Sequence, residues 1–73
     1  MTKIARRICA AQDCLREKYG IDGYNRLIAK MKNQTGDDLM ILVHIYQDNN
    51  VSSVVRLTAL ATMGEQMEDS NGK

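Results

Sequence analysis

The chain of 73 residues contains no proline, no phenylalanine and no tryptophan, and three tyrosines supply its only aromatic rings. Without proline, no residue removes a backbone N–H from a helix interior. Without large apolar rings, the core has to be built from Leu, Ile, Val, Met and Ala, and several of these favour helices. The longest apolar run covers eight residues, well short of the ~20 that a membrane-spanning helix needs. These absences predict an all-α fold with no membrane contact.

Motifs for metal binding and catalysis are missing as well. His44 is the only histidine, and the spacing of Cys9 and Cys14 is not that of a CxxC site. On a helix these two cysteines point roughly 140° apart, which disfavours a disulfide. No phosphate-binding glycine loop occurs, and short helices leave little room for a concave site. We therefore expect no catalytic residue, no metal, no cofactor and no enzymatic activity. No secretory signal pattern follows Met1, so we expect a cytoplasmic protein.

The formal net charge of +1 conceals an uneven distribution. Residues 1–33 carry eight basic and three acidic side chains, whereas residues 34–73 carry two basic and six acidic ones. The first half can therefore present a basic face to nucleic acid or to an acidic partner. The candidates for this face are Lys3, Arg6, Arg7, Arg26, Lys30 and Lys32.

Apolar residues at spacings of three and four predict four helical segments. The segments are residues 3–19, 23–32, 37–47 and 51–68. Gly20 follows the first segment, where a left-handed residue is favoured, and "NQTG" (residues 33–36) is expected to form a loop. The expected N-caps of the later segments are Asp22, then Asp37 or Asp38, then Asn50. We predict a small four-helix bundle, or three helices plus one, as a single domain over residues 1–67 with a flexible tail at 68–73.

The segment "LMILVHIY" (residues 39–46) is the hardest to assign. A short apolar run fits either a helix or a strand, and its β-branched residues favour a strand. The alternative architecture has two helices plus a β-hairpin over residues 39–58. We favour helices because the following "VSSVVRLT" does not alternate, and because an isolated hairpin is barely stable.

As a helix, this segment would be apolar around most of its circumference and would have to be buried. Either the other helices cover it as a central helix, or a second copy or another protein does. We predict an interaction patch of Met40, Val43, His44 and Tyr46, because Met and Tyr adapt readily to partners. The bundle is then expected to be completed by oligomerisation.

These features predict a small non-enzymatic regulator that binds and occludes another protein. In size and composition the chain resembles the short regulators carried by phages and plasmids, such as antirepressors, antitoxins and inhibitors of host defences. The alternative is a small DNA-binding regulator that uses the basic face or a degenerate helix-turn-helix at residues 39–60. With Asn49 at the turn position usually held by glycine, Val55 falls at a core position. Asp48, Asn50 and Thr58 then stand where apolar side chains belong.

Overall fold

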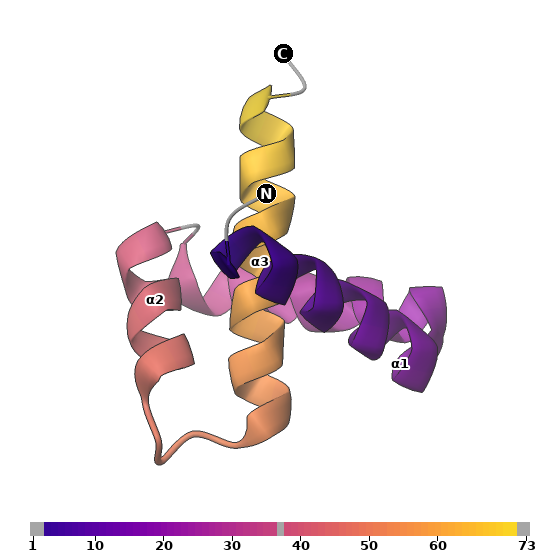
Figure 1. Ribbon diagram of the computed structural model, residues 1–73, viewed down its shortest axis with the longest axis horizontal. Helices are drawn as coiled ribbons and strands as arrows, with labels where there is room; N and C mark the ends of the chain where they lie inside the picture. The colour runs from indigo at the N-terminus through magenta and orange to yellow at the C-terminus, as the bar shows by residue number, and fades with distance from the viewer. Residues whose placement is uncertain (1–2, 37, 72–73) are drawn as a thin grey trace.

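The computed structural model describes residues 3–36 and 38–71, with side chains up to Met67, and these residues form three α-helices (Figure 1). The helices are α1 (Lys3–Thr35), α2 (Leu39–Gln47) and α3 (Ser53–Asn71). The predicted all-α class is confirmed. The alternative β-hairpin over residues 39–58 is wrong, because α2 and the first turns of α3 occupy that stretch and the described residues contain no strand.

Helix α1 joins the first two predicted helices through a kink. Gly20 has φ 75° and ψ 173°, so it leaves the helical conformation with the positive φ that was predicted, and the chain turns back at this point (Figure 1). We refer to residues 3–19 as the first arm and residues 21–35 as the second arm. Four helical segments were predicted from the spacing. The described residues form three helices, because the first two predicted segments are the two arms of α1.

The second arm is longer at both ends than its predicted range of 23–32. Asp22 lies within its first turn rather than ahead of it, so the predicted cap is displaced. The predicted loop at residues 33–36 is wrong for its first three residues. Buried Thr35 donates its hydroxyl to the Met31 carbonyl at 2.9 Å, which satisfies this polar side chain inside the helix. Gly36, with φ 61°, is the residue that ends the helix.

The central helix of the fold is α3, which passes between the two arms of α1 (Figure 1). Every residue from 58 to 64 is buried. Most of these side chains are small, and the backbones therefore approach closely where the first arm crosses α3. A Cβ atom placed on Gly64 would overlap Ile8 and lie 2.7 Å from Gln12 Nε2.

Two apolar clusters hold the arms against α3. The first is made of Ile8, Ala11, Met31, Leu42, Ala59, Leu60 and Met63. The second is made of Leu15, Tyr24, Ile28 and Ala61. Both clusters combine residues of the first arm, the second arm and α3, so the helical hairpin and the central helix form one core.

Local hydrogen bonds set the bounds of α2 and α3. Asp38 caps α2, as predicted, by accepting a hydrogen bond from the Met40 N–H at 2.9 Å. Asn50 does not cap α3, because the helix begins only at Ser53; the Asn50 N–H donates instead to the Asp48 side chain at 2.9 Å in the turn before it. The helix starts after Ser52, whose hydroxyl accepts from the Val55 N–H at 3.4 Å.

Helix α2 lies at the edge of the fold and packs against α3 (Figure 1). Leu42 is its one buried residue, so this most apolar element of the chain is not the central helix. Helix α3 extends to Asn71. The side chains of residues 68–71, and residues 72–73, lie outside the described part, and the flexible tail at 68–73 stays a prediction.

Candidate protein-binding surface

One side of α2 is apolar and open to solvent. A helix turns by about 100° per residue, so anchoring Leu42 against α3 directs Met40, Ile41 and His44 away from the core. Leu39, in the first turn, is also exposed. Leu39, Met40 and Ile41 are 46%, 66% and 42% exposed, respectively. We call Leu39, Met40, Ile41 and His44 the outer face of α2.

The outer face overlaps only in part with the patch predicted from the sequence. Met40 and His44 belong to it, whereas Val43 and Tyr46 are half-buried and pack against the first apolar cluster. Leu39 and Ile41 were not anticipated. Because almost every side chain of α2 is apolar, its sequence does not show which one points inward, and only the position of Leu42 in the core decides this.

Tyr46 connects three elements of the fold. Arg7 of the first arm donates from Nη1 to the Tyr46 hydroxyl at 3.0 Å. Arg56 of α3 donates from Nε to the Tyr46 carbonyl oxygen at 2.9 Å. Tyr46 therefore holds α2 in place, and two of the basic side chains in this region are already engaged within the chain.

The six residues of the predicted basic face are shared between the two arms of α1. Lys3, Arg6 and Arg7 lie on the first arm, whereas Arg26, Lys30 and Lys32 lie on the second. The two arms pass on opposite sides of α3 (Figure 1). The structure thus divides the predicted face into two smaller groups, and this separation weakens the electrostatic attraction that a nucleic-acid backbone would feel.

The arrangement of α2 and α3 also differs from a helix-turn-helix. That motif joins two helices at ~90–120°. Here the helices pack side by side in opposite directions, joined by residues 48–52 (Figure 1). Arg56, the basic residue in the first turns of α3, is bound to Tyr46. These observations weigh against the degenerate helix-turn-helix considered at residues 39–60.

A polar cluster joins both arms to α3. The buried Tyr24 hydroxyl donates to Glu65 Oε1 at 2.7 Å, and Arg16 Nη2 lies 3.6 Å from the same oxygen. The Arg16 guanidinium also covers the Tyr24 ring at 4.6 Å from its centroid. Burial, and then the hydrogen bond to Glu65, raise the pKa of Tyr24 above its ordinary value. The three residues of this cluster thus tie both arms of α1 to α3.

The remaining candidates for chemistry lie apart. Cys9 and Cys14 are free thiols on the exposed side of the first arm, and His44 is on the outer face of α2. Among the described residues, no three side chains of the metal-binding types come together. In the same part of the chain, no helix has both the length and the apolar character to cross a membrane.

We find no match between this chain and any known protein family, curated protein or solved structure. The exposed apolar face of α2 is therefore the feature on which its function has to be argued.

Proposed function

We propose that the protein is a small non-enzymatic regulator that acts by binding another protein through the outer face of α2. The observation that supports this is a helix of nine residues with no Asp, Glu, Lys or Arg, three of whose large apolar side chains are 42–66% exposed. Contiguous exposed apolar residues mark interaction surfaces, whereas scattered ones need no explanation. Met40 and His44 lie one helical turn apart, with Ile41 and His44 at i, i+3, so these side chains adjoin on the side of α2 that faces away from Leu42.

The size of this face indicates what it contributes to binding. Full burial of a large aliphatic side chain is worth about 1.5–3 kcal/mol. Because the three side chains are about half buried already, covering them adds roughly 3 kcal/mol in all. Micromolar affinity corresponds to a net binding free energy of about 8 kcal/mol, and the contacts must supply the cost of association in addition. The outer face of α2 therefore acts as an anchor within a larger contact.

The expected mode is a helix docking into an apolar groove. Met40 and His44 are one turn apart and Ile41 lies beside them, which is the spacing by which amphipathic helices fill such grooves. A regulator that covers the working groove of its partner in this way would block it. Self-association belongs to the same proposal, because an uncharged face meets its own copy without like-charge repulsion.

Site-specific photo-crosslinking tests this proposal. We expect p-benzoylphenylalanine in place of Met40 to crosslink a discrete partner, or a second copy, in cells that naturally contain the protein. The same group in place of exposed Ala10 on the first arm is the matched control and should give no such product. If the variant at position 40 is folded and yields neither product, or yields the same products as the control, the proposal is wrong.

A further inference from the structure

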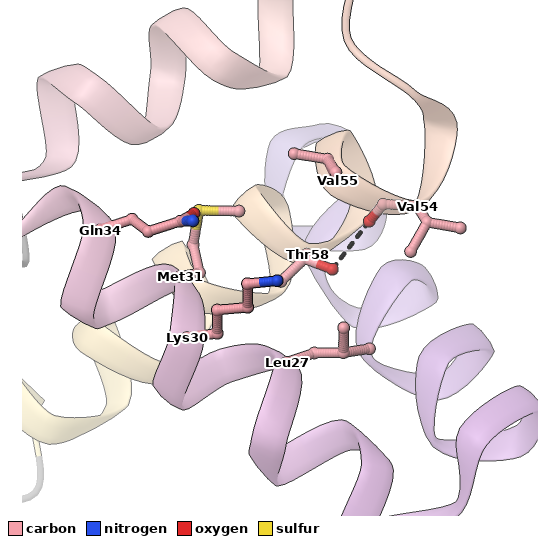
Figure 2. A pocket seen from close by; sticks show the side chains of 7 residues that line it. All are labelled: Leu27, Lys30, Met31, Gln34, Val54, Val55 and Thr58. Carbon is pink, nitrogen blue, oxygen red and sulfur yellow. Dashed lines mark hydrogen bonds between the residues drawn. The ribbon is translucent and has the colours of Figure 1, made fainter.

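A groove separate from the outer face of α2 lies between the second arm of α1 and the first turns of α3. Figure 2 shows Lys30, Met31 and Gln34 of the second arm facing Val54, Val55 and Thr58 of α3 across it. The Thr58 hydroxyl donates to the Val54 carbonyl at 2.7 Å, so the internal polar group is satisfied. The surface that remains open inside is mainly apolar.

The groove has the volume for one large apolar group. Its free volume is about 150 Å³. An engineered protein cavity of about this volume, lined by aliphatic side chains, binds benzene. Val55 at the edge of the groove is 39% exposed although it is β-branched and apolar. An occupant that inserts one phenylalanine- or leucine-sized side chain would cover Val55 and contact buried Met31.

Lys30 is the one charged residue among those that line the groove. Residues 23–36 and residues 51–64, which include every residue lining it, contain no acidic side chain and four basic ones. The four are Arg26, Lys30, Lys32 and Arg56. Val54 and Val55 also lie in the first turn of α3, where the helix dipole places partial positive charge. The acidic residues Asp38 and Asp48 lie just outside these two segments, and each accepts a hydrogen bond from a backbone N–H.

We propose that this groove binds an acidic segment of a partner protein. One large apolar side chain of that segment fills the groove, and a neighbouring carboxylate pairs with the Lys30 ammonium group. The apolar pocket favours a peptide over a phosphate backbone, because a phosphate backbone would leave Met31, Val54 and Val55 uncovered. The inference rests on the proposed function only in that the occupant is a protein, and it concerns a different surface from the outer face of α2.

Labelled peptides test the groove directly on the full chain. The probe is a fluorescein-labelled 12-residue peptide of Glu, Asp and Ser with one central Phe. The controls replace that Phe by Ala, or every acidic residue by Lys. In anisotropy titrations we expect the acidic Phe peptide to bind with a Kd on the order of 100 µM, and both controls to bind at least about tenfold more weakly.

Variants locate the binding site. Lys30→Glu and Val55→Glu should each weaken binding of the acidic Phe peptide at least about tenfold. Lys18→Glu and Ala10→Glu make the same charge changes at exposed positions of the first arm and should leave binding nearly unchanged. Lys30 and Val55 are both exposed, so circular dichroism of these variants should match that of the unchanged chain. If Val55→Glu disturbs the fold, Lys30→Glu alone carries the comparison.

Three results would overturn the proposal: no binding of the acidic Phe peptide at about 1 mM, equal binding of the Ala control, or loss of binding in Lys18→Glu. Binding of duplex DNA that competes with the peptide and is lost in Lys30→Glu would also overturn it, since the surface would then recognise phosphate. Met40→Glu separates the two proposals. It should leave peptide binding intact, and failure of the peptide test leaves the crosslinking test at Met40 unaffected.

Discussion

Tyr24 is the residue at which both arms of α1 and the central helix meet. Its hydroxyl donates to Glu65, its ring lies under Arg16, and its side chain is 3% exposed. The hydrogen bond joins the second arm to α3 and the ring contact joins the two arms, so Tyr24 links all three segments.

Replacing Tyr24 by Phe removes one hydrogen bond to a carboxylate and keeps the ring. We expect the free energy of unfolding to fall by about 1.5–3 kcal/mol, the usual contribution of a hydrogen bond to a charged group. Chemical denaturation at pH 7 measures this loss. Tyr19→Phe, at the exposed end of the first arm, is the matched control and should change stability by less than about 0.5 kcal/mol. Equal effects of the two substitutions would show that the Tyr24 hydroxyl contributes nothing.

The same hydroxyl has a pH signature. Because the pKa of Tyr24 is raised on folding, the unfolded chain loses this proton more readily than the folded protein does. The contribution of Tyr24 is therefore complete below its ordinary pKa of about 10 and declines as the pH rises above it. Denaturation midpoints between pH 8 and about pH 11 should fall more steeply for the unchanged chain than for Tyr24→Phe. Parallel pH profiles would contradict this.

Helix α3 owes its central position to small side chains rather than to strong hydrophobicity. Ala59, Ala61 and Gly64 allow both arms to approach its backbone, and the Gln12 side chain donates to the Ala61 carbonyl at 3.4 Å. The apolar spacing in the sequence correctly predicted a helix in this part of the chain. It did not predict that Thr58 and Thr62 would be buried too. Their hydroxyls bond to carbonyls one turn earlier, and this local satisfaction is invisible to hydrophobic periodicity.

Gly64→Ala tests the close crossing of α3 with the first arm. The added methyl group would overlap Ile8 and crowd Gln12, so the arm has to move outward. We expect a loss of about 1–3 kcal/mol in the free energy of unfolding, even though alanine is the better helix former. Ile8→Ala removes the Cγ2 atom that the new methyl group would overlap, so Gly64→Ala should cost less in an Ile8→Ala background than in the unchanged chain. Stabilisation by Gly64→Ala alone would show that the crossing is looser than described.

Helix α2 has two sides that differ sharply in their expected sensitivity. Leu42 is fully buried, and its replacement by Ala should cost about 2–5 kcal/mol by leaving a cavity. Met40 is two-thirds exposed, and Met40→Ala should change stability by no more than about 0.5 kcal/mol. Thermal unfolding of both variants measures the contrast. A large loss for Met40→Ala would mean that its side chain belongs to the core.

Some features of the fold follow from local sequence preferences, whereas the position of the most apolar segment does not. The left-handed Gly20 and the cap at Asp38, one of the two candidates, follow from local preferences and were predicted. The position of the most apolar segment was not, because residues 39–46 fit a central helix as well as a peripheral one. The outcome depends on which helix the arms of α1 can approach closely, and Gly64 and the alanines of α3 decide it.

A chain this short cannot bury all of its apolar side chains within a single monomer. A chain of 73 residues buries only about 60% of the surface that its unfolded form exposes. Eight of its ten basic residues are divided between the two arms, whereas exposed apolar side chains of α2 lie within a single helical turn. Association driven by apolar contact is therefore better supported than association driven by charge.

Concentration-dependent mass measures this preference. By light scattering, we expect the average mass to rise above the monomer value of 8.2 kDa as the concentration increases towards about 1 mM, in keeping with the weak anchor that α2 provides. Raising the salt concentration should leave this association intact or strengthen it, because screening affects charge pairs and not apolar contacts. Met40→Glu should keep the mass at that of the monomer, while Ala10→Glu should not.

If instead the mass is constant for the unchanged chain, the outer face of α2 serves a different protein only. Association that disappears with salt would point to the basic arms and away from α2.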